Sequence, residues 1–157
     1  QFFLHPFLMN LFQLYHHKKY KEFKKKVYQI CFVLFIIGIS LSIIGGVIGI
    51  PVLEFIYGIS LKGYQTSLFI ILIGAILYGI VSVLYNLLVA IRCVFSQIIV
   101  YLFLSVFSVA LNFVLIDKMQ IVGASFSYFF VMFVALIVYL ILFHSYIKRK
   151  ENECVKS

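Results

Sequence analysis

Charged residues are scarce in this chain. They make up 11% of its 157 residues, whereas 64% are hydrophobic and the net charge is +8. An ordinary soluble domain has about 25% charged residues, so the composition excludes a water-soluble globule, a disordered tail and a nucleic-acid-binding module. The basic residues stand at the ends of apolar runs, which is typical of a polytopic membrane protein with basic cytoplasmic edges.

Sequence motifs for catalysis, metals and cofactors are also lacking. The three cysteines, Cys31, Cys93 and Cys154, form no CxxC pair, and the histidines have no second ligand at helical spacing. We therefore expect no metal site and no disulfide framework. The sequence contains no GxSxG, no phosphate-binding loop and no GxGxxG, so we expect neither an enzyme nor a cofactor.

Four stretches are long and apolar enough to cross a membrane as helices, which takes about 20 residues each. They are residues 27–50, 67–91, 96–116 and 122–147. We predict an all-α, four-helix transmembrane bundle over 27–147, with a basic tail in 148–157. Residues 1–26 are expected to hold the end of a preceding helix and a basic connection.

Glycine and proline predict how the first helix ends and packs. Pro51 is expected to close it, and residues 51–66, with Gly58 and Gly63, to form the longest connection. Within the helix, small residues form a stripe that would let another helix approach closely. They are Gly38, Ser42, Gly45, Gly46 and Gly49.

Positive charge falls mainly on one side of these stretches. The chain has 13 Lys and Arg residues. Lys62 and Lys118 fall on one side of the predicted membrane segments, and all the others fall on the opposite, lysine-rich and arginine-rich side. The positive-inside rule makes the richer side cytoplasmic. An even number of crossings returns the chain to that side, so both flanks are predicted to be cytoplasmic.

Polar side chains recur on one face of the second and third stretches. Their spacing of three or four residues places them along single helical faces, and they are Tyr78, Ser82, Asn86, Tyr101, Ser105, Ser108 and Asn112. Together with Arg92, whose guanidinium could hold a lipid pyrophosphate, they form a candidate substrate cavity. The same residues could instead serve only as contacts between helices, and Arg92 could simply mark a cytoplasmic turn.

Three segments carry a family resemblance. They are Pro6 with the basic run 17–25, the segment IPVLEFIYG at 50–58, and LNFVLIDK at 111–118 leading into IVGAS at 121–125. In order and spacing they resemble the polysaccharide repeat-unit flippases of the multidrug/oligosaccharidyl-lipid/polysaccharide exporter superfamily. The matching structural residues are Pro51, Gly58, Gly123 and Ala124. Relative to the family pattern, Asp117 replaces a proline, Gln120 a glycine and Ser125 an alanine, and the first two replacements predict a less rigid connection.

The resemblance implies that these are the last four of twelve helices, in a fold of two six-helix bundles around a central cavity. The expected partners are then the N-terminal half of the same protein, membrane lipids and a lipid-linked oligosaccharide, but no nucleic acid. The implied function is translocation of undecaprenyl-pyrophosphate-linked repeat units across a bacterial plasma membrane, for capsule, O-antigen or exopolysaccharide synthesis.

Two other functions remain open. A cation-coupled multidrug antiporter of the same superfamily would place a carboxylate at membrane depth, whereas the five acidic residues here all fall in flanks or connections. They are Glu22, Glu54, Asp117, Glu151 and Glu153. A stand-alone four-helix assembly subunit is disfavoured because the chain lacks an initial methionine and residues 2–14 resemble the end of a helix, which indicates a fragment.

Overall fold

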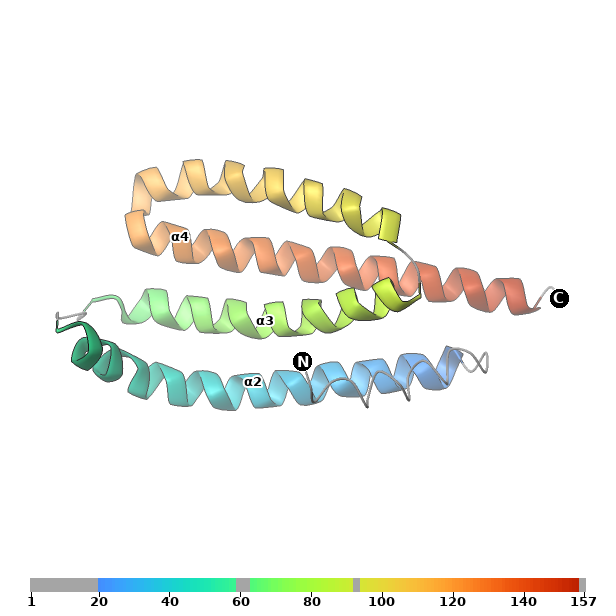
Figure 1. The fold of residues 1–157 in the computed structure, drawn as a ribbon, viewed down its shortest axis with the longest axis horizontal. Coiled ribbons are helices and arrows are strands. Elements are labelled where there is room, and N and C mark those ends of the chain that lie inside the picture. The colour runs from blue at the N-terminus through green and yellow to red at the C-terminus, as the bar shows by residue number, and fades with distance from the viewer. Residues whose placement is uncertain (1–19, 59–62, 92–93, 156–157) are drawn as a thin grey trace.

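The computed structural model describes residues 20–58, 63–91 and 94–155, which form helices and no strand. The helices are α2 (Tyr20–Tyr57), α3 (Gln65–Ala90) and α4 (Val94–Val155) (Figure 1). All three are long and apolar enough to cross a membrane, so the predicted all-α class is confirmed for this part of the chain. Several residues named above lie outside it: Pro6, residues 17–19 of the basic run, Lys62, Arg92 and Cys93.

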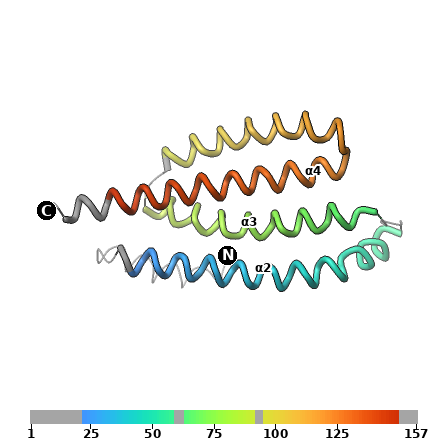
Figure 2. The backbone as a smooth tube through the Cα atoms, turned by 180° about the vertical axis from the view of Figure 1, so that it is seen from behind, coloured from blue at the N-terminus to red at the C-terminus, as the bar shows by residue number. Residues whose placement is uncertain are grey.

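Helix α4 is a hairpin of two arms and contains both of the last two predicted stretches. Its backbone leaves helical geometry at Gln120, with φ 48° and ψ −123°. The two arms run side by side in opposite directions (Figures 1 and 2). The predicted count of four separate helices is not confirmed, because the described residues form three helices, of which α4 is interrupted at Gln120.

Pro51 does not close the first helix, contrary to the prediction. Helix α2 continues through Pro51 to Tyr57 and ends at Gly58, whose φ of 66° suits glycine. The Gly58 N–H donates to the Glu54 carbonyl oxygen at 2.9 Å, in a helical pattern. Proline removes one backbone donor and typically kinks a helix without always ending it, and the last turns of α2 bend away from its axis (Figure 1). The connection to α3 is consequently shorter than the predicted 51–66.

The small-residue stripe of α2 packs against α3, as the sequence predicted. A methyl group added at Gly38 would lie 2.9 Å from Cγ1 of Ile76, and one added at Gly49 would lie 3.1 Å from Leu68. Gly45 and Gly46 similarly face other α3 side chains. The missing side chains let the two helix backbones approach closely.

The apolar core lies toward the end of the bundle where α2 begins, α3 ends and α4 begins and ends (Figure 2). Phe23 and Val27 of α2 reach it, and the second arm of α4 contributes Tyr139, Phe143 and Ile147. The other core residues come from α3 and both arms of α4: Ile80, Val81, Val83, Leu84, Leu87, Leu88, Ile91, Val100, Leu104 and Ala135. This end also carries most of the described basic residues, whereas Lys118 lies near the turn at the opposite end.

Candidate functional site

The polar stripe of α3 lies on a face that is largely uncovered. Tyr78 is 56% exposed, Asn86 is exposed and Ser82 is partly exposed. Asn86 donates from Nδ2 to the Ser82 carbonyl oxygen at 2.8 Å, one helical turn earlier. This hydrogen bond stays within α3, so it does not hold Asn86 against another helix.

The stripe on the first arm of α4 has the same character. Tyr101 is 53% exposed and Ser105 is also exposed, whereas Ser108 and Asn112 are half-buried. Nδ2 of Asn112 contacts Oγ of Ser108 at 3.4 Å, again one turn away on the same helix. The amides of both stripes thus use neighbours in their own helices, which argues against the interpretation that they connect helices.

A group of tyrosines joins the two stripes. The ring of Tyr85 on α3 meets the ring of Tyr101 edge-on, with centroids 5.6 Å apart. Tyr78 is also close enough to Tyr101 for electrostatic interaction between them. The two stripes therefore approach each other at these tyrosines. We use the name polar face for the residues of both stripes: Tyr78, Ser82, Asn86, Tyr101, Ser105, Ser108 and Asn112. Arg92, the remaining predicted cavity residue, lies outside the described residues.

Tyr139 lies at the inner edge of this polar face and was not predicted. Its ring packs edge-on against Tyr85 at 6.4 Å, and only 1% of the residue is exposed. Its hydroxyl lies against the Tyr101 side chain, and a polar partner lowers the cost of burying a hydroxyl group. The sequence contains little sign of this role, because Tyr139 stands alone among apolar residues. One sign is its spacing of 11 residues from Tyr128, which places both tyrosines on the same helical face. Tyr128 lies near Tyr78.

The family-motif residues have structural roles in the described parts of the chain. Gly123 is buried at the α4 turn, where an added methyl group would overlap the Leu115 carbonyl group. Gly58 ends α2, and Ala124 is exposed.

The polar face carries hydroxyl and amide groups that can form hydrogen bonds with a ligand. Polar side chains on membrane helices are costly in contact with lipid, so such a face normally adjoins other protein or a water-filled cavity. Among the described residues, no three His, Cys, Asp or Glu side chains are grouped so as to hold a metal ion. The chain matches no protein-family model, no curated protein and no solved structure.

Proposed function

We propose that the chain forms the last four membrane-crossing segments of a flippase. Its substrate would be an undecaprenyl-pyrophosphate-linked oligosaccharide repeat unit, moved across a bacterial plasma membrane for capsule, O-antigen or exopolysaccharide synthesis. The basic end of the bundle would face the cytoplasm, in line with the positive-inside rule. The two arms of α4 would each cross the membrane, which makes four crossings with α2 and α3.

The observation that carries the proposal is the polar face shared by α3 and the first arm of α4. Asn86 and Asn112 each make one amide hydrogen bond within their own helix. Asn86 is exposed and Asn112 is half-buried. A sugar chain offers hydroxyl groups that amides and tyrosine hydroxyls can bind. A lipid-linked sugar also needs a polar wall beside an apolar surface, and α3 provides both. The resemblance of the α4 turn to the flippase motif supports the same function.

The backbone geometry of the α4 turn also supports the resemblance to the flippase motif. Gln120 replaces the glycine of the family pattern, and its φ of 48° is one that glycine adopts without strain. Gly123 matches the pattern and lies where a side chain would overlap the opposite arm. Positions 120 and 123 of the motif thus both favour glycine in this hairpin.

We test the proposal with Asn86→Leu and Asn112→Leu, introduced into the native gene of the source bacterium. Each should lower the amount of surface polysaccharide several-fold while the protein level stays normal, because leucine removes the amide without opening a cavity. Ser40→Leu is the matched control, since Ser40 is an exposed polar residue of α2 that also bonds within its own helix, to the Ile36 carbonyl at 3.1 Å. Unchanged polysaccharide in both asparagine variants would contradict the proposal, and a change in drug susceptibility instead would favour the antiporter.

A further inference from the structure

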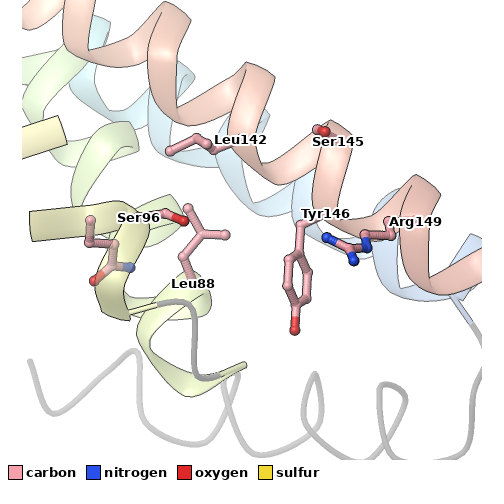
Figure 3. A pocket seen from close by; sticks show the side chains of 7 residues that line it. Leu88, Ser96, Leu142, Ser145, Tyr146 and Arg149 are labelled. Atoms are coloured by element: carbon pink, nitrogen blue, oxygen red, sulfur yellow. The ribbon is translucent and has the colours of Figure 1, made fainter. Parts of the chain in front are cut away.

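A pocket at the basic end of the bundle shares no residue with the polar face. It has a volume of about 160 Å³ and is partly open to the surroundings. Its walls come from the end of α3, the first turns of α4 and the last turns of α4 (Figure 3). The lining residues are Leu88, Ser96, Gln97, Leu142, Ser145, Tyr146 and Arg149.

Two polar contacts hold the walls of this pocket in place. Gln97, which is only 3% exposed, donates from Nε2 to the Tyr85 carbonyl oxygen at 3.1 Å. The Tyr146 hydroxyl donates to the Ile91 carbonyl oxygen at 3.2 Å. Both bonds join α4 to the last turns of α3, so they fix the two ends of α4 to the same segment. A pocket built on such contacts is preorganised, which lowers the entropic cost of binding.

Three further polar side chains of the pocket carry donors that can bind an anion. Ser96 and Ser145 carry hydroxyl groups, and the guanidinium of Arg149 extends toward the ring of Tyr146 (Figure 3). None of the seven lining residues is acidic. A guanidinium carries five N–H donors in a planar fork that matches phosphate oxygens, so Arg149 can bind a phosphate while it keeps another contact.

The other wall of the pocket is apolar, which favours a phosphate carried by a molecule with an apolar part, such as a lipid. Leu88 and Leu142 line it, from α3 and from the second arm of α4. Both helices have the length and apolar composition of membrane spans, and Arg149 lies where the apolar part of α4 gives way to charged residues. An arginine at such a boundary lies at headgroup depth.

We propose that this pocket binds the phosphate group of a membrane lipid, with Arg149 as its main ligand and the hydroxyl groups of Ser96 and Ser145 as additional donors. Leu88 and Leu142 would contact the first carbons of the lipid chain. This proposal does not rest on the proposed function, because the pocket could bind any phosphate-bearing lipid in the leaflet at the basic end of the bundle. A lipid held here would tie both ends of α4 to α3.

The experiment is a competition assay on the full chain in a neutral detergent. Fluorescent phosphatidylglycerol is bound first, and its anisotropy is followed as unlabelled competitors are added. Phosphatidylglycerol should displace the probe, whereas diacylglycerol, which lacks the phosphate, should not. Inorganic phosphate should compete only at concentrations at least about a hundredfold higher, because it lacks the apolar contacts. Competition by free phosphate at the same concentration as the lipid would overturn the lipid assignment.

Three variants locate the binding. Arg149→Gln should weaken phosphatidylglycerol binding about tenfold or more, as expected for loss of charged hydrogen bonds. Lys148→Gln, the matched control, removes the same charge one residue away from an exposed position outside the pocket, and it should weaken binding less than threefold. Ser145→Leu fills the pocket without changing charge and should also weaken binding at least threefold. Equal losses for Arg149→Gln and Lys148→Gln, or no loss for Ser145→Leu when circular dichroism shows a folded protein, would overturn the pocket as the site.

Discussion

Gln120 adopts a backbone conformation that favours glycine. Its φ of 48° with ψ of −123° lies in a sparsely populated region for a residue with a side chain, and such strain costs about 1–3 kcal/mol. The conformation reverses the chain between the two arms of α4. Gly123, three residues later, completes the turn because its bare Cα lets the Leu115 carbonyl approach. Of the two positions in this turn that favour glycine, 123 is occupied by glycine and 120 by glutamine.

We predict that Gln120→Gly raises the free energy of unfolding by about 1 kcal/mol, because glycine relieves the strain but loses more entropy on folding. The measurement is a titration from a mild detergent into sodium dodecyl sulfate, followed by circular dichroism. Met119→Gly is the matched control, since Met119 is an exposed residue of helical geometry beside the turn. It should lower the free energy of unfolding by about 1 kcal/mol. A decrease for Gln120→Gly of the same size would contradict the strain argument.

At the scale of the elements, glycines decide how closely α2 approaches α3. Ile76 contacts the position where a Gly38 side chain would lie, with Cγ1 and Cγ2 at 2.9 and 3.0 Å. Isoleucine is stiff about χ1 in a helix, so it has little freedom to move aside. Gly79 on α3 has open space in the corresponding position. The two glycines therefore share the same helix propensity but differ in packing.

A comparison of Gly38→Ala with Gly79→Ala separates these effects. Both substitutions gain up to about 1 kcal/mol from helix propensity, but only the first forces a methyl group against Ile76, at a cost of about 1–3 kcal/mol. We expect Gly79→Ala to stabilise the chain and Gly38→Ala to be less stable than Gly79→Ala by about 1–2 kcal/mol in the same detergent titration. Equal stabilities would show that α2 does not pack on α3 through this stripe.

Apolar length predicted the positions of the helices well, because long runs without charge leave a chain few alternatives in a membrane. Periodicity also predicted the small-residue stripe that faces α3, whereas the contact between Tyr85 of α3 and Tyr101 of α4 is visible only in the structure. The path of α2 through Pro51 could not be predicted, since proline either kinks or ends a helix according to its surroundings. The basic-end pocket was missed because Gln97 and Arg149 are 52 positions apart in the sequence and meet only through folding. A local signal existed in Ser145 and Arg149, which are one helical turn apart.

At the scale of the whole molecule, α2 is joined to the rest of the bundle in two different ways. Within the described ranges it packs mainly on α3, and large apolar side chains such as Phe32, Leu41 and Phe55 are exposed. At its first turns it also meets the second arm of α4. There Phe23 and Phe143 are fully buried with ring centroids 6.0 Å apart, and Lys24 Nζ contacts His144 Nδ1 at 2.9 Å.

The contact between the first turns of α2 and the second arm of α4 holds the basic end of the bundle together. We predict that Phe143→Ala separates α2 from α4 there. Loss of a fully buried aromatic ring costs about 3–5 kcal/mol in a packed core, whereas Phe113→Ala on the same helix should cost less than about 1 kcal/mol because Phe113 is 72% exposed. Hydrogen exchange gives the location as well as the size of the effect. Backbone amides near Phe23 should exchange faster in Phe143→Ala, while those near Gly45, which are held by the contact with α3, should keep their rates. Faster exchange along all of α2 would mean that contact with α4 stabilises the whole helix. Equal effects of Phe143→Ala and Phe113→Ala would mean that Phe143 does not hold α2 against α4.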